Sequence, residues 1–345
     1  MRHTVTAALI LLGLLFLLPI LLFGVEGMTF EPEPVLTPPA EAVPPPSAGI
    51  DQGQTVTLWR TAQGQVETLT MEEYLWGVVA AEMPASFHTE ALKAQTVAAR
   101  TYALRKGKSV TQAHPDAMLC DDHTCCQAYT TREAAAANWG NQTAFYTDKV
   151  TAAVSQTDGL VMTYGGELID AVFHSSSSGS TADAAEVWGT GVAYLQPVYT
   201  PEGEEVPNYH TQVTLPRGEF RQIFLSAHPE ATLNENGGAW FGGTTLTAAG
   251  AVNTMEVGGV LVRGTEMRRL FGLRSARFTV AAGDENVTFS VTGYGHGAGM
   301  SQYGANAMAG AGSGFKEILT HYYTGVVVEQ MVLETVAPAG EVVVY

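Results

Sequence analysis

Basic residues are scarce in this chain of 345 residues, which has 17 lysines and arginines against 34 aspartates and glutamates and a formal net charge of −17. Proteins that bind nucleic acid or anionic lipid headgroups through their overall field need the opposite charge balance, so this shortage argues against both partners. Any other acidic polymer would be repelled in the same way, so such a partner would have to be held by local contacts.

Two catalytic signatures are also missing. The serine-rich run at 175–178 is not framed as the Gly-x-Ser-x-Gly elbow of serine hydrolases, so no serine nucleophile is predicted there. The glycine-rich segment at 293–299 is not followed by Lys-Ser or Lys-Thr and is not a phosphate-binding loop. Its glycines either let the backbone approach a substrate groove, with His296 and Gln302 lining it, or serve tight helix–sheet packing.

The first 27 residues are predicted to form the cytoplasmic N-terminus and a transmembrane helix. Arg2 and His3 precede an uncharged, leucine-rich run from Thr4 to Val25, which as a helix would span about 33 Å of the roughly 30 Å hydrocarbon core. A cleaved signal peptide is the alternative, but residues 23–27 are a poor cleavage site. The charges on either side predict that the body lies outside the cytoplasm.

Residues 28–53 are predicted to be a semi-rigid spacer, because seven prolines between 31 and 50 favour an extended conformation. Residues 54–345 are predicted to be an α+β body with a helical lobe and a β-rich lobe that form a substrate groove. A capping box at Thr70 and Glu73 predicts a helix to about Ala81. The other expected elements are a strand from Thr55, an alanine-rich helix at 89–106, a loop at 107–130, β-rich chain from about Gln142, and short helices at 266–270 and 301–308.

Glu82 is the candidate general acid. It follows the apolar turn 78–81 and precedes a break at Met83-Pro84, so its carboxyl group is predicted to lie at a partly desolvated helix end. Desolvation raises a carboxyl pKa and keeps a proton available for a leaving oxygen. An ordinary surface glutamate is the alternative. Lys93 and Arg100 share one face of the next helix and are either substrate contacts or part of a solvated basic face.

Three blocks of the sequence carry distinctive short motifs. They are EMP, ALKAQ and AARTYAL at 82–104, FHSSSSG, EVWG and AYLQPV at 173–198, and GYGHGAGMSQYGANAMA at 293–309. Together they resemble the stage II sporulation protein D family, also called the SpoIID/LytB domain, over about residues 55–325. Ser180 and Ala193 depart from the family pattern, which usually has glycine and proline there.

The resemblance implies that Glu82 is the catalytic residue and that Lys93, Arg100 and Tyr194 are functionally important. It also implies lytic transglycosylation of MurNAc–GlcNAc strands during sporulation engulfment, preferably strands whose stem peptides an amidase has removed. A hydrolase usually needs two carboxylates, whereas this reaction needs one. No partner carboxylate is obvious, although Asp116, Asp121 and Asp122 remain candidates.

The partners implied are glycan strands, the amidase stage II sporulation protein P and the membrane protein stage II sporulation protein M. The implied location is the mother-cell membrane, with the body facing the septal wall. Two alternatives stay open. The groove holds glycan without cutting it and stimulates an amidase, or the protein is a vegetative wall enzyme of the same family.

The three cysteines lie close together beside two histidines, a density of ligands that tetrahedral zinc prefers. Some relatives carry zinc in this loop, and the match predicts a structural Zn²⁺ held by His114, Cys120, Cys125 and Cys126, with His123 in reserve. A disulfide or three free thiols are the alternatives, although an odd number of cysteines argues against disulfides alone.

Overall fold

The computed structural model describes residues 49–109, 111–234 and 239–331. Residues 49–53, the end of the predicted spacer, belong to the compact folded unit. The predicted anchor at 1–27 lies outside the described residues. Within the described ranges, no helix is long and apolar enough to cross a membrane.

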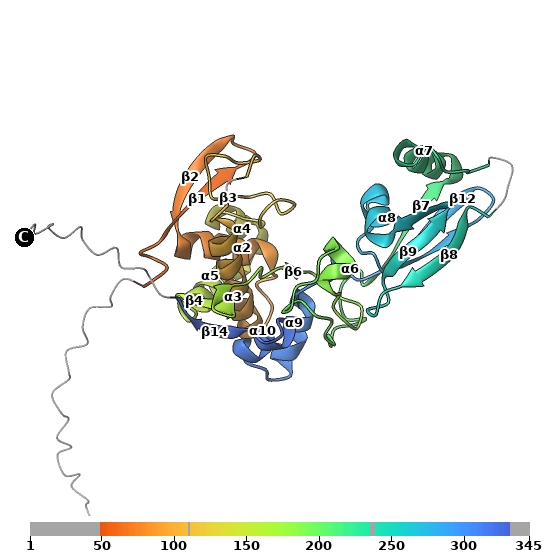
Figure 1. Ribbon diagram of the computed structural model, residues 1–345. Coiled ribbons are helices and arrows are strands. Elements are labelled where there is room, and N and C mark those ends of the chain that lie inside the picture. The colour runs from red at the N-terminus through yellow and green to blue at the C-terminus, as the bar shows by residue number, and fades with distance from the viewer. Residues whose placement is uncertain (1–48, 110, 235–238, 332–345) are drawn as a thin grey trace, which may run out of the picture. The chain divides into compact units, whose positions relative to one another are not determined.

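The first hydrophobic core is built around two helices, α2 (Met71–Glu82) and α3 (Thr89–Lys106), which lie in the orange and brown part of Figure 1. Helix α2 begins at the predicted capping box, because Thr70 Oγ1 accepts a hydrogen bond from Glu73 N at 3.1 Å and the Glu73 carboxylate accepts one from Thr70 N at 3.0 Å. A small sheet precedes it, in which β1 pairs antiparallel with β2 and parallel with β3. These strands are β1 (Thr55–Arg60), β2 (Gln65–Thr70) and β3 (Leu119–Cys120).

More helix packs on this core than the sequence indicated. The chain after Gln142 was expected to be β-rich, but it forms α5, whose buried Val150, Ala153 and Val154 recur at helical spacing and face α2 and α3. A second missed helix, α10, also packs on α3. The remaining elements of this region are α4 (Arg132–Trp139), the 3₁₀ turn η1 (Gly140–Gln142), α5 (Thr143–Ser155), β4 (Leu160–Tyr164), β5 (Glu167–Leu168), α10 (Phe315–Tyr322) and β14 (Val327–Gln330).

A second hydrophobic core lies between two antiparallel three-stranded sheets, ordered β10-β9-β8 and β11-β12-β7, and the helices α7 and α8 (Figure 1). Aromatic rings fill it: Phe220 stacks on Phe271, and Phe289 lies tilted against Phe271. The elements are β7 (His210–Pro216), α7 (Arg217–Ala227), β8 (Phe241–Leu246), β9 (Val252–Val257), β10 (Val260–Arg263), α8 (Gly264–Phe271), β11 (Phe278–Ala282) and β12 (Asn286–Thr292). The described chain is therefore α+β, with one largely helical core and one β-rich core.

A short parallel pairing joins the second and third motif blocks. Strand β13 (Met300–Ser301) pairs with β6 (Phe173–His174), and helix α9 (Gln302–Gly310) follows directly. The glycines of the third block make this contact possible. A Cβ at Gly299 would lie 2.1 Å from Val172 O, and one at Gly295 would lie 2.6 Å from the Cβ of His174. Both have positive φ, so these glycines serve tight packing.

Candidate functional site

Glu82 is the last residue of α2 and its side chain is only partly exposed. Met83 is already extended, with φ −128° and ψ 135°, because the following Pro84 disfavours the helical conformation there. The backbone N–H of Ala128, which comes from the cysteine loop, donates to Glu82 Oε1 at 2.7 Å. The helix end and the loop together fix the position of the carboxyl group.

Burial raises the pKa of Glu82 above its ordinary value. Three groups act in the opposite direction: the Ala128 N–H, the charge of His123 and a hydrogen bond from the side chain of Gln302. Desolvation outweighs them. Glu82 therefore keeps its proton to a higher pH than an exposed glutamate, as the sequence predicted.

Gln302, the first residue of α9, is brought to Glu82 by the β13–β6 pairing. Its Nε2 also lies 3.5 Å from Oε1 of Gln95, a buried residue of α3. The Nε2 of Gln95 has no hydrogen-bond partner among the described residues. A buried amide donor without a partner is costly, and because Gln95 is fully buried this donor is not exposed to a ligand.

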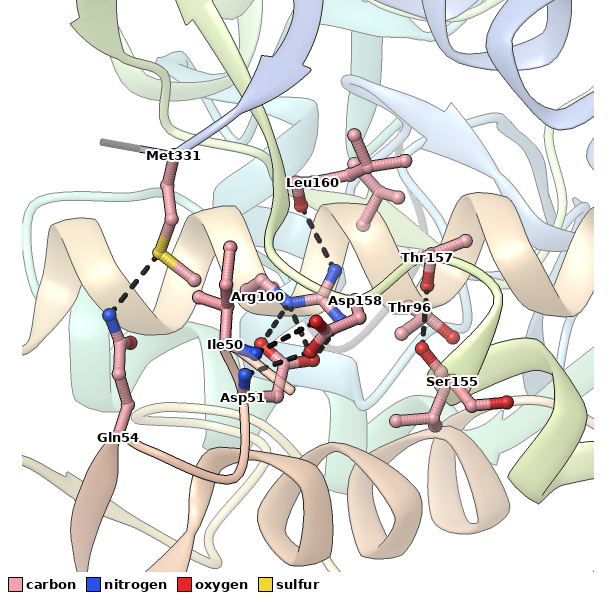
Figure 2. Close-up of polar contacts among 12 residues, drawn as sticks. Ile50, Asp51, Gln54, Thr96, Arg100, Ser155, Thr157, Asp158, Leu160 and Met331 are labelled. Atoms are coloured by element: carbon pink, nitrogen blue, oxygen red, sulfur yellow. Dashed lines mark hydrogen bonds and ion pairs between the residues drawn. The ribbon is translucent and has the colours of Figure 1, made fainter. Parts of the chain in front are cut away.

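Arg100 is not available to a substrate. Its side chain is fully buried, its Nη2 lies 2.5 Å from Asp51 Oδ2, and its Nη1 donates to Leu160 O at 3.0 Å (Figure 2). Asp158 holds the same segment, because its carboxylate accepts hydrogen bonds from the N–H groups of Ile50 and Asp51 at 2.8 Å. The predicted sugar contact of Arg100 is corrected to a structural ion pair.

Lys93 and Tyr194 also make contacts within the protein. Lys93 Nζ lies 2.6 Å from Glu90 Oε1, and the same glutamate accepts a hydrogen bond from the N–H of Phe315, so it links α3 to the start of α10. The hydroxyl of Tyr194 accepts a hydrogen bond from Asp170 N at 2.9 Å. No contact of either residue with Glu82 occurs in the described part of the chain, and their substrate roles stay predictions.

His296 lies with a different group of side chains. Its Nε2 is 3.0 Å from Phe173 O, and its ring is 5.3 Å from that of Trp188 and 5.5 Å from that of His174. Burial and the nearby charge of Arg268 lower the pKa of His296 to about 4. The imidazole is therefore neutral at neutral pH.

The four predicted metal ligands converge. Their candidate ligand atoms, one each from His114, Cys120, Cys125 and Cys126, all lie within 4.8 Å of one another. All three cysteines are free thiols, so the disulfide alternative does not hold in this structure. His123 is exposed and lies toward Glu82, outside this set.

The donor chemistry of this cluster fits zinc. The Nδ1 of His114 lies 2.9 Å from the carbonyl oxygen of Ala117. When Nδ1 donates a hydrogen bond to that oxygen, Nε2 is the nitrogen that keeps a lone pair, and it lies 3.3 Å from Cys126 Sγ. Three thiolates and one imidazole are a usual set for a closed structural zinc site. Burial raises the pKa of the Cys126 thiol to about 12, and a divalent cation would be needed to offset this.

Comparisons with known proteins agree with the motif blocks. A family model described as "Stage II sporulation protein" matches residues 60–164. The chain is 36% identical over 274 residues to stage II sporulation protein D of Bacillus subtilis (strain 168), a match that covers 79% of this chain and 78% of the relative. The chain belongs to the stage II sporulation protein D family. The SpoIID protein of Bacillus amyloliquefaciens matches it to the same extent.

A second type of relative is more distant. An amidase enhancer of Bacillus subtilis (strain 168) is 31% identical over 303 residues, which cover 73% of this chain and 39% of that longer protein. The SpoIID family is thus a sporulation family with a relative named an amidase enhancer.

Several residues at the site were missed by sequence reasoning. The Ala128 N–H has no side-chain signature, and Gln95 looks like any polar residue of an alanine-rich helix. Two hollows lie elsewhere on the surface, one of about 560 Å³ beside β7 and β12 and one of about 150 Å³ beside Asp51 and Asp158. Neither is lined by Glu82, and the predicted groove there stays a prediction.

Proposed function

We propose that this SpoIID-family protein is a lytic transglycosylase that cleaves MurNAc–GlcNAc strands, with Glu82 as its acid and base. The observation that supports the proposal most is the environment of Glu82, a partly buried carboxyl group with a raised pKa, held by Ala128 and Gln302. Among the described residues, no second carboxylate is one of the groups that set this pKa. A mechanism with one carboxyl group suits such a site better than a mechanism with two.

The three aspartates considered as partners are engaged elsewhere or exposed. Asp121 accepts a hydrogen bond from Arg60 Nε at 3.1 Å, and Asp122 accepts one from Thr124 N at 2.8 Å. Asp116 is exposed. This arrangement supports a single-carboxyl reaction.

In the proposed reaction, protonated Glu82 donates its proton to the glycosidic oxygen between MurNAc C1 and GlcNAc, and that C–O bond breaks. The resulting carboxylate then takes the proton of the 6-hydroxyl of the same MurNAc, and the 6-oxygen attacks C1. The strand ends in a 1,6-anhydro ring, no water is consumed, and Glu82 is protonated again. Gln302 would orient the carboxyl group in both steps.

A non-catalytic role is the second candidate, because one relative is named an amidase enhancer. In that case the region around Glu82 would hold glycan strands and stimulate an amidase without cutting. In either role, stage II sporulation proteins P and M are the proposed partners. Residues 1–27 would anchor the protein in the mother-cell membrane, and the body would lie outside the cytoplasm and face the septal wall.

We also propose a structural Zn²⁺ at His114, Cys120, Cys125 and Cys126. Cys126 precedes Ala128 by two residues, and Ala128 donates to Glu82. The ion would hold this loop in place and thereby the N–H that contacts the acid. It has no part in the bond-breaking steps.

The test is the length of purified peptide-free strands after incubation with the full chain or with its Glu82→Gln variant. Shortening by the wild type alone supports catalysis by Glu82. Equal shortening by both proteins overturns it. Intact strands that co-sediment with the wild type favour the binding role.

A further inference from the structure

A surface near the second and third motif blocks carries aromatic rings and arginines in a protein with few basic residues. Trp188, the last residue of α6 (Ala184–Trp188), is 49% exposed, and Tyr294 is 44% exposed. The guanidinium of Arg274 lies 3.9 Å from the centre of the Tyr294 ring. Arg268 lies near both rings, because Tyr294 contributes to the pKa of Arg268 and the charge of Arg268 lowers the pKa of His296. We call Trp188, Tyr294, Arg268 and Arg274 the arginine platform.

The arginines of this platform have no acidic partner. In the described ranges, no aspartate or glutamate forms an ion pair with Arg268 or Arg274, whereas Arg269 on the same helix lies 3.7 Å from Glu266. The Nε of Arg274 is buried without a hydrogen-bond partner among the described residues, and Arg268 Nε has only the backbone oxygen of Leu273, at 3.3 Å.

Arg268 is also partly buried, and this burial lowers its pKa. A guanidinium held away from water without a counter-ion is costly, and an acidic chain has many carboxylates that could have been placed there. The neighbouring imidazoles carry no negative charge in any protonation state, and the low pKa values of His296 and His174 leave both rings neutral at neutral pH. The uncompensated charge indicates an anionic group on the ligand.

The aromatic residues indicate the rest of the ligand. Exposed Trp and Tyr rings offer flat apolar faces that suit the C–H face of a pyranose ring. The platform is connected to Glu82 through the chain, because the segment that carries Tyr294 and His296 continues through β13 to Gln302. The proposal therefore requires a strand long enough to contact both Glu82 and this surface.

We propose that the arginine platform binds a muramic acid unit of the strand through its free D-lactyl carboxylate, with the sugar ring stacked on Trp188 or Tyr294. This inference rests on the proposed function, since it assumes a peptidoglycan strand as the ligand. In a strand that still bears stem peptides, the lactyl carboxyl group is an amide and carries no charge. The new element is the assignment to these residues: the platform would be the structural basis of the preference for peptide-free strands that the family resemblance implies.

The test measures binding by the full chain carrying Glu82→Gln, so that no strand is consumed. Three ligands are compared: peptide-free strands, strands with intact stem peptides, and chitin oligosaccharides, which lack the lactyl group. We expect the tightest binding to peptide-free strands. Arg268→Gln and Arg274→Gln should each weaken that binding about tenfold and leave chitin binding unchanged, since each removes a charge-assisted contact.

Matched variants separate charge from folding. Arg269→Gln, on the same helix but exposed and paired with Glu266, should change nothing. Trp188→Ala should weaken binding of all three ligands. Arg268→Lys keeps the charge and should keep the preference for peptide-free strands, even if Arg268→Gln folds poorly.

Three results would overturn the inference. The first two concern the arginine variants: an equal loss of affinity for chitin and for peptide-free strands, or no loss of affinity for either. The third is binding of strands with stem peptides that is as tight as, or tighter than, binding of peptide-free strands, which would indicate that a peptide carboxylate is the ligand. Failure of the proposed function looks different, because wild-type protein would leave strands uncut while the binding preference persists.

Discussion

The guanidinium of Arg100 lies 2.5 Å from the carboxylate of Asp51, and both side chains are almost completely buried, at 0% and 2% exposed (Figure 2). Arg100 belongs to the central helix α3, whereas Asp51 comes from the segment in which the proline-rich spacer was predicted to end. Asp158 fixes that segment from the other side through the N–H groups of Ile50 and Asp51.

Loss of one member of this pair should destabilise the fold. Arg100→Met leaves the Asp51 carboxylate buried and unpaired, and we expect a loss of about 3–5 kcal/mol in the free energy of unfolding. The double variant Arg100→Met/Asp51→Leu should lose less, because it leaves no isolated charge. Urea unfolding checks both. A single variant that is as stable as the wild type but no longer binds glycan would restore Arg100 as a substrate contact.

Zinc should be present and should support the fold. Elemental analysis of protein purified under reducing conditions is expected to give about one zinc per chain, and Cys126→Ser should lose it and melt at a lower temperature. A chelator should destabilise the wild type but have no further effect on Cys126→Ser. The matched control is His123→Ala, which lies outside the four-ligand set and should keep its zinc. Metal-free wild-type protein with an unchanged melting temperature contradicts the prediction.

Glu82 should reduce stability when it is ionised. Its folded pKa is raised above the ordinary value of 4.5, so the native state binds more protons than the unfolded state between these two values, and stability falls as the pH rises through that window. Glu82→Gln should therefore be more stable than the wild type at neutral pH. The difference should vanish below pH 4.5, where both states are protonated. If the difference in melting temperature between Glu82→Gln and the wild type does not change with pH across this range, the raised pKa is contradicted.

Gln302 should tune the pH dependence of cleavage. Its hydrogen bond lowers the pKa of Glu82, so Gln302→Leu should raise that pKa further. Because the acid must carry its proton, the fall of kcat/KM on the alkaline side should move to higher pH. Gln212→Leu on the exposed face of β7 serves as the control and should leave the profile in place. An unchanged profile in Gln302→Leu means that Gln302 does not affect the acid.

Local signals in the sequence predicted the elements that depend on local chemistry. The capping box fixed the start of α2, the proline break fixed its end, and the alanine-rich run matches α3 at Thr89–Lys106. The clustering of the metal ligands was also predictable, because all but His114 lie within a few residues of one another. The four candidate ligand atoms do lie within 4.8 Å of one another, and the zinc site itself stays a prediction.

Long-range contacts were not predictable in the same way. The role of Arg100 depends on Asp51, which is 49 residues away and looked like part of a spacer. The helical spacing of Lys93 and Arg100 predicted that their side chains point in similar directions. It did not predict that Arg100 meets a buried carboxylate. The Ala128 N–H at Glu82 is a backbone group, and only the folded loop places it there.

The most direct test of the proposed reaction is mass spectrometry of the ends formed when the full wild-type chain acts on peptide-free strands in ¹⁸O-labelled water, with Glu82→Gln as control. We predict 1,6-anhydro ends, one water lighter than reducing ends and free of ¹⁸O, formed by the wild type alone. Reducing ends that carry ¹⁸O would contradict the account, because they require water as the nucleophile and a second group to activate it.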